Sequence, residues 1–64
     1  MTAKEMFEEL GFEFSETDKY IIYEFDGEKT GFCKTEKTFL NGFIMHGAYF
    51  NACIQQFKEM GWLE

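Results

Sequence analysis

The sequence predicts an α+β fold of two layers, with elements in the order α-β-β-β-α. Apolar residues recur at helical spacing near both ends, over residues 3–10 and 50–57, and a glycine follows each run. Between them, residues 19–25 are rich in β-branched and aromatic side chains and lead directly into Asp-Gly, a strong hairpin signal. We therefore expect a three-stranded antiparallel meander with both helices on one face. At 64 residues, the chain predicts a single domain, 1–64.

The first helix is predicted from its two ends. Thr2 and Glu5 have the spacing of a capping box, and Gly11 can adopt the left-handed conformation that ends a helix. Phe12 can then fold back onto Phe7. The apolar side of this helix would carry Ala3, Met6, Phe7 and Leu10. Residues 13–18 are polar and are expected to be irregular.

Three strands are predicted next. The first covers 19–25, with Ile21, Tyr23 and Phe25 on one face and Tyr20, Ile22 and Glu24 on the other. Asp-Gly at 26–27 would turn the chain into a second strand over 28–34. After a polar turn at 35–37, residues 38–44 predict a third strand, bulged at Asn-Gly 41–42.

The last helix is predicted over residues 46–60. Its apolar stripe is Phe50, Cys53, Ile54 and Phe57, widened by Tyr49, Ala52 and Met60. Gly61 would end the helix, and Trp62 would reach back to Phe57 and be largely buried.

The charge of the chain excludes some partners. Net charge is −6, and there is no arginine. Residues 1–28 hold nine acids against two lysines, a balance of −7, and residues 29–64 hold three acids against four lysines, a balance of +1. Nucleic-acid binding requires a basic surface that displaces counterions from phosphate, so we expect no direct binding to nucleic acid. An anionic membrane is disfavoured for the same reason.

No catalytic, metal or cofactor site is predicted. His46, Cys33 and Cys53 are separated by spacings that match no zinc motif, and the glycines form no phosphate-binding loop. No signal-peptide pattern or membrane-spanning apolar run is present, and two cysteines are too few for a small secreted fold. We therefore expect a cytoplasmic protein with free thiols.

Aromatic residues are the one feature above background. They make up 20% of the chain, and they do not all fit on predicted core-facing positions. Some can serve as core and helix caps. Aromatic side chains also concentrate at the centres of protein interfaces. The candidate partner surface, for an unknown protein or for a homodimer, consists of Tyr20, Phe39, Phe43 and Trp62.

Three segments together carry a resemblance: the opening Phe-x-Glu-Leu-Gly-Phe, the strand Tyr-Ile-Ile-Tyr and the closing helix 52–60 followed by Gly-Trp. They resemble small proteins encoded by prophages and conjugative elements of low-GC Gram-positive bacteria. The resemblance implies an accessory gene product and supplies no catalytic residues.

The sequence thus favours a non-enzymatic interaction module that uses an aromatic surface. The alternative is an acidic mimic of nucleic acid that inhibits a host DNA-binding protein or nuclease, motivated by the acidic residues of segment 1–28.

Overall fold

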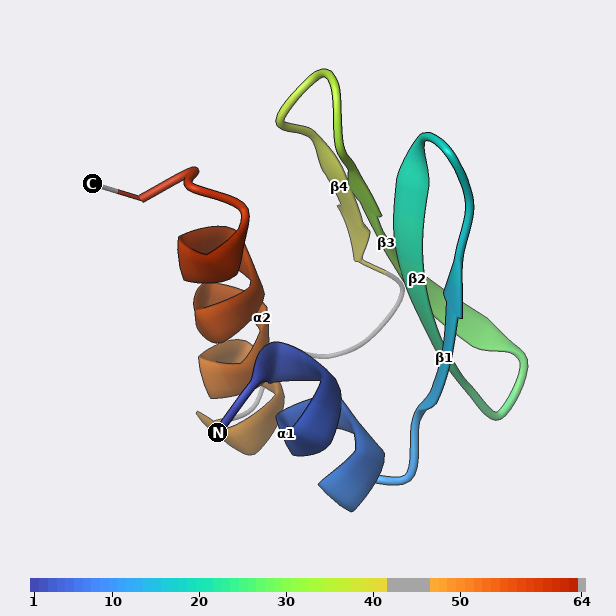
Figure 1. The fold of residues 1–64 in the computed structure, drawn as a ribbon. Coiled ribbons are helices and arrows are strands. Elements are labelled where there is room, and N and C mark those ends of the chain that lie inside the picture. Colours follow the sequence, from blue (N-terminus) through green and yellow to red (C-terminus); the bar gives the residue numbers. More distant parts are fainter. Residues whose placement is uncertain (42–46, 64) are drawn as a thin grey trace.

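The computed structural model describes residues 1–41 and 47–63. Within these residues, two helices and four strands follow one another in the order α1-β1-β2-β3-β4-α2 (Figure 1). The strands form one antiparallel sheet whose spatial order is the sequence order, and both helices lie on the same side of it. The elements are α1 (Ala3–Glu9), β1 (Glu13–Glu16), β2 (Tyr20–Phe25), β3 (Glu28–Cys33), β4 (Phe39–Asn41) and α2 (Gly47–Glu59). The predicted α+β class is confirmed.

Both predicted helix ends are confirmed in detail. The Thr2 hydroxyl accepts from the Glu5 amide, and the Glu5 carboxylate accepts from the Thr2 amide, which completes the capping box. These hydrogen bonds lower the pKa of Glu5. At the other end, Gly11 has a φ of 95°, and the Phe12 amide donates to the Phe7 carbonyl at 3.1 Å. This pattern is the Schellman motif, which satisfies carbonyls that the helix leaves unpaired.

The prediction of three strands was wrong by one. Residues 13–16, expected to be irregular, form the edge strand β1, which pairs with β2 in the register Glu13↔Glu24 to Glu16↔Ile21. Glutamate is depleted in strands, and Phe14 is the single large apolar residue of this segment. β1 forms because it pairs with the edge of β2 that β3 does not occupy. This pairing cannot be predicted from the sequence of residues 13–16 alone.

The hairpin at Asp26-Gly27 is confirmed. Both residues have positive φ, 52° and 81°, as a type I′ turn requires. The predicted third strand corresponds to β4, for which Phe39–Asn41 are described. The expected bulge at 41–42 and the rest of that strand, including Phe43, involve residues 42–44. These residues lie outside the part of the chain that the structure describes. The same holds for the predicted helix start at His46.

The buried side of α2 is rotated from the predicted stripe. The buried residues are Tyr49, Ala52, Cys53 and Gln56, whereas Phe50 is 46% exposed. Tyr49, Ala52 and Cys53 belong to the predicted stripe as well, so the differences are Gln56, which is buried, and Phe50, which is exposed. The rotation comes from the sheet, which supplies hydrogen-bond partners for the side chains of Tyr49 and Gln56.

The core lies between the helices and the sheet and consists mainly of aromatic rings. Phe7 of α1 stacks on Tyr23 of β2, with ring centroids 3.9 Å apart and an interplanar angle of 15°. Phe32 of β3 contacts the Tyr23 ring edge-on at 6.1 Å. Tyr49, Phe12, Ala52 and Cys53 complete the buried cluster. The aromatic excess is therefore used first to fill the core of a very small fold.

Two buried hydrogen bonds join α2 to the sheet. The Tyr23 hydroxyl donates to Gln56 Oε1 at 2.6 Å, and Thr30 Oγ1 and the Tyr49 hydroxyl share a hydrogen bond of 2.7 Å. Such groups are costly to bury unless they are paired. The pairs therefore fix how α2 is rotated and placed over the sheet.

Candidate functional site

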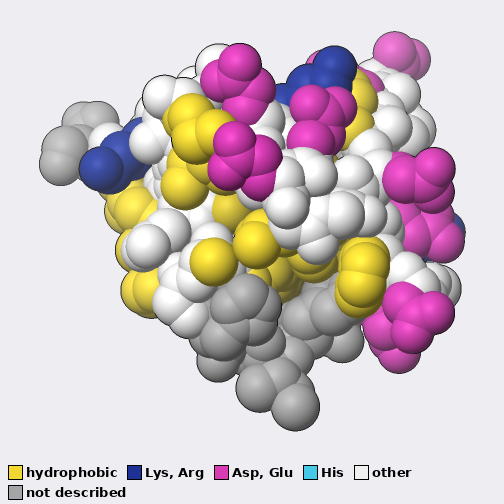
Figure 2. All heavy atoms as spheres, turned by 90° about the horizontal axis from the view of Figure 1, so that it is seen from below, with side chains coloured by type: hydrophobic (Ala, Val, Ile, Leu, Met, Phe, Trp, Pro, Cys, Tyr) yellow, Lys and Arg dark blue, Asp and Glu magenta, His cyan; other side chains and the backbone are white. Residues whose placement is uncertain are grey.

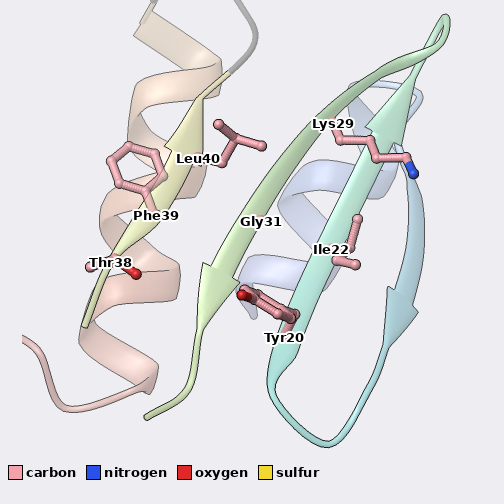
Figure 3. Close-up of a pocket in the computed structure, with 7 residues that line it drawn as sticks. All are labelled: Tyr20, Ile22, Lys29, Gly31, Thr38, Phe39 and Leu40. Carbon is pink, nitrogen blue, oxygen red and sulfur yellow. The ribbon is translucent and has the colours of Figure 1, made fainter. Parts of the chain in front are cut away.

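The sheet face directed away from the helices is the candidate functional site. We call it the open face; strand pairing arranges it in three rows. The rows are Glu13, Glu24 and Lys29; then Ser15, Ile22, Gly31 and Leu40; then Tyr20 and Cys33. Figure 3 shows this face from the front, with both helices behind the sheet. A charged row thus borders the row of Ile22, Gly31 and Leu40, and Tyr20 lies in the row beyond it.

A shallow hollow lies in the middle of the open face. Its volume is about 410 Å³, and its lining includes Tyr20, Ile22, Gly31 and Leu40. Gly31 contributes no side chain, so Leu40 and Ile22 stand on either side of it (Figure 3). The Leu40 side chain is 67% exposed and Tyr20 is 45% exposed. Exposed apolar groups gathered around a hollow are typical of a contact surface.

The structure separates the residues of the predicted partner surface. Tyr20 lies on the open face. Phe39 lies mainly on the helix side, where its ring contacts Phe57 at 5.1 Å and Phe32 at 5.4 Å, although it also borders the hollow. Trp62 packs on Phe57 at the end of α2, with ring centroids 5.5 Å apart and an interplanar angle of 20°. Phe43 lies outside the described residues.

Phe39 and Trp62 come close to one another, but Tyr20 does not join them. They line a second, smaller groove together with Lys37, Phe57 and Leu63, between the β3–β4 turn and the end of α2. The predicted surface is thus divided between two sites, and its contact with a partner stays a prediction.

The sequence did not lead us to expect Leu40 or Gly31 in the site, and it did not predict that Ile22 lines the hollow. The alternation within residues 19–25 already placed Ile22 on the face opposite Tyr23. Leu40 follows Phe39 in a strand, where successive side chains point to opposite faces of the sheet. This alternation is the one feature of the sequence that could have placed Leu40 on the open face. Their position in one row depends on the registers Ile22↔Gly31 and Gly31↔Leu40, which are set between strands.

Charge is unequal at the two ends of the sheet, counted over both of its faces. We call the end near the 26–27 turn the hairpin end and the end near the 17–19 and 34–37 turns the turn end. The hairpin end carries Glu13, Glu24, Asp26 and Glu28 against Lys29, a balance of −3. The turn end carries Lys19, Lys34 and Lys37 against Glu16, Asp18 and Glu36, a balance of zero. Lys34 and Glu16 form an ion pair of 2.5 Å there.

The hairpin end lies close to the end of α1, because the rings of Phe12 and Phe25 are 5.5 Å apart. The exposed acids Glu8 and Glu9 of α1 therefore extend the acidic surface beyond the sheet. Figure 2, which views the molecule from below Figure 1, shows acidic side chains around exposed apolar ones and few basic side chains.

The two cysteines have different chemistry. Cys53 is a core residue, and its burial raises the pKa of the thiol to about 11, which makes it a poor nucleophile. Hydrogen bonding to the Thr35 side chain and backbone lowers the pKa of Cys33, whose Sγ lies 3.5 Å from the Thr35 hydroxyl. Cys33 is itself buried. Over residues 1–41 and 47–63, no group of three or more His, Cys, Asp and Glu side chains is placed to hold a metal ion.

Comparison with known proteins gives no relative. Neither protein-family models, nor curated proteins, nor solved structures match the chain. Of the described helices, neither α1 nor α2 has the length and apolar character needed to cross a membrane. The fold and the open face therefore define the class of molecule by themselves: a four-stranded antiparallel sheet covered by helices on one side.

Proposed function

We propose that the protein is a non-enzymatic interaction module whose contact surface is the open face of the sheet. The observation that carries this proposal is the apolar row in which exposed Leu40 lies beside Gly31 and half-buried Ile22, next to exposed Tyr20. A fold this small buries little apolar surface. An apolar side chain that stays exposed to water therefore adds nothing to the stability of the core. Leu40 and Tyr20 lie on the sheet, so a partner that covers this face would bury them.

The surface proposed here differs from the four residues expected from the sequence. It keeps Tyr20, adds Ile22 and Leu40, and leaves Trp62 to the packing of α2. An accessory role of the kind found on mobile genetic elements, and a cytoplasmic location, belong to the same proposal and are supported by the sequence resemblance and composition alone.

A pull-down tests the proposed surface. Tagged wild-type protein and a Leu40→Glu variant are compared for the proteins that each retains from cell extract. Phe50→Glu is the matched control, because Phe50 is similarly apolar and exposed but lies on α2. Binding that is lost in Leu40→Glu and kept in Phe50→Glu supports the open face. Equal loss, or no loss, in the two variants contradicts it.

The acidic hairpin end favours a second candidate function, the mimicry of nucleic acid. Carboxylates of α1, β1 and the β2–β3 hairpin lie on neighbouring parts of the surface, where they can stand in for phosphates toward a basic protein. Such binding should weaken steeply with salt. Pull-down at low and at high salt separates the two candidates, because apolar contact through Leu40 survives high salt and charge pairing does not.

A further inference from the structure

We propose that the partner of the open face is an extended segment of another protein, which places one uncharged aromatic side chain on Gly31, between Ile22 and Leu40. This inference rests on the proposed function, since it names the class of partner for the same surface. The observation behind it is a glycine at the centre of the sheet that no described residue of the chain requires.

Gly31 has neither of the usual structural reasons for glycine. Its φ lies outside the positive region that favours glycine, and an added Cβ would meet only Ile22 Cγ1, at the ordinary contact distance of 4.0 Å. Gly31 lies in β3, which is paired on both edges, and glycine weakens the interior of a strand. Such a glycine often marks a place where a ligand or another chain approaches the backbone closely. We therefore assign the bare backbone of Gly31 to a contact from outside the fold.

The hollow above Gly31 has the shape that a flat ring fits. Ile22 and Leu40 stand on either side of Gly31 in the strand register, with bare backbone between them (Figure 3). A ring lying on this backbone would contact both apolar side chains with its edges. Tyr20 borders the same hollow and offers a second aromatic surface and a hydroxyl. Aromatic side chains are the usual anchors at the centres of protein interfaces.

The charges of the open face favour an uncharged anchor. Lys29 borders the hollow, but it stands opposite Glu24 in the register, and Glu24 stands opposite Glu13, so this row has a balance of −1. A carboxylate therefore gains nothing there. The centre of the hollow, between Ile22 and Leu40, is apolar, and burying a charge against it would be costly.

The area of the open face limits the partner to a short segment. Four strands about 4.8 Å apart and about five residues long give roughly 350 Å². A stable interface between folded domains, including two copies of this chain, buries about 800 Å² per partner. The hollow is also shallow, whereas sites for free small molecules enclose most of the ligand. An extended segment meets both limits, because its ring occupies the hollow and its neighbouring residues cover Leu40 and Tyr20.

Gly31→Val tests the role of the glycine. Valine suits a strand and has room at this position, so we expect the melting temperature to rise by about 4–8 °C. The same side chain would occupy the place of the ring, so binding should be lost. Gly47→Val is the matched control for binding, because Gly47 is exposed and lies on α2. A Gly31→Val variant that melts below wild type would show that the fold itself needs this glycine, which overturns the proposal.

The probe is the capped tripeptide Ser-Trp-Ser, with Ser-Ala-Ser as its control, titrated into ¹⁵N-labelled protein. Ser-Trp-Ser should shift the amide signals of Ile22, Gly31 and Leu40 and saturate with a dissociation constant of about 1–10 mM. Ser-Ala-Ser should cause no such shifts. Gly47→Val should bind as wild type does, and Gly31→Val should not bind.

Several results would overturn the proposal. They are the absence of saturating shifts in wild type, equal shifts with the two peptides, and unchanged binding by Gly31→Val. Free indole that binds as tightly as Ser-Trp-Ser would assign the hollow to a small molecule instead. Signals of Gly31 that move with protein concentration alone would assign the open face to a second copy.

The pull-down judges the proposed function separately. A partner that is lost in Leu40→Glu but retained by Gly31→Val keeps the open face as a binding site and removes the aromatic anchor on Gly31. A partner that Leu40→Glu still retains contradicts the proposed function itself.

Discussion

At the scale of single residues, two tyrosine hydroxyls connect the layers of the molecule. Tyr23 and Tyr49 are both fully buried, and each hydroxyl has a partner in the other layer. A buried hydroxyl without a partner would cost more than the hydrogen bond contributes, so these bonds act mainly by excluding other placements of α2. No buried side-chain nitrogen or oxygen atom among the described residues is left without a partner.

Removal of the Tyr23 hydroxyl tests this interpretation. Tyr23→Phe leaves Gln56 Oε1 buried without its donor, and we expect the free energy of unfolding to fall by about 1–3 kcal/mol. Tyr20→Phe is the matched control, because Tyr20 is 45% exposed and its hydroxyl can bond to water. The double variant Tyr23→Phe/Gln56→Leu should regain part of the loss. Urea unfolding measures all three, and equal stability of the two single variants would refute the argument.

At the scale of elements, the local motifs could be read from the sequence, whereas the relations between elements could not. The helix caps at Gly11 and Gly61 and the Asp26-Gly27 hairpin depend on neighbouring residues, and all three are as predicted. The strand β1 and the rotation of α2 depend on partners distant in sequence. The open face has the same origin, because Leu40 joins Ile22 only through the pairing of three strands.

The two glycine caps allow a matched prediction. Gly11 and Gly61 have φ angles of 95° and 76°, which favour glycine, so alanine at either position should cost about 1 kcal/mol from backbone strain. An added Cβ at Gly61 would meet open space, whereas at Gly11 it would lie 3.3 Å from the Phe25 ring. We therefore expect Gly11→Ala to lower the melting temperature more than Gly61→Ala. The reverse order would contradict the close approach.

Trp62 contributes to stability through the end of α2. Its amide donates to the Phe57 carbonyl at 2.9 Å, and its ring stacks on Phe57 and lies 6.3 Å from Phe32. The ring is half-buried, which is less than the sequence led us to expect. Trp62→Ala should therefore cost about 2 kcal/mol, below the ~3–5 kcal/mol of a fully buried aromatic residue, and lower the melting temperature by about 10 °C.

A circular-dichroism melt measures this effect. Leu63→Ala is the control, since Leu63 is the next residue and is 47% exposed. If Trp62→Ala and Leu63→Ala melt together, the stacking of Trp62 on Phe57 does not stabilise the fold.

At the scale of the whole molecule, the core should make stability depend on alkaline pH. Burial raises the pKa of Tyr49 to about 12 and that of Cys53 to about 11, and it raises the pKa of Tyr23 as well. In the unfolded chain these groups ionise near ~10 for tyrosine and ~8.5 for cysteine. As pH rises above ~8.5, the unfolded chain therefore loses protons that the folded chain keeps, and the free energy of unfolding falls.

Urea midpoints between about pH 7.5 and 11 check the sign. They should decrease steadily above about pH 8.5, and Cys53→Ala should flatten the profile between about pH 9 and 11. Cys33 acts in the opposite sense, since its pKa is lowered in the fold, so Cys33→Ala should steepen the profile. A profile that is flat to pH 11 in wild type would show that these side chains are hydrated.

One hydrogen bond that belongs to no local sequence motif links α1 to α2. In addition to the contacts between α1 and α2, the amide of Ala3 donates to Glu59 Oε2 at 2.7 Å, across 56 positions of sequence. Each strand, by contrast, pairs with its neighbour along the chain, so the sheet can form with little loop-closure entropy. A helix of seven residues is not stable alone in water, so α1 persists only while it is docked. Amide hydrogen exchange should consequently find α1 opening by itself, at a lower free energy than the strands, and this opening breaks the hydrogen bond between Ala3 and Glu59.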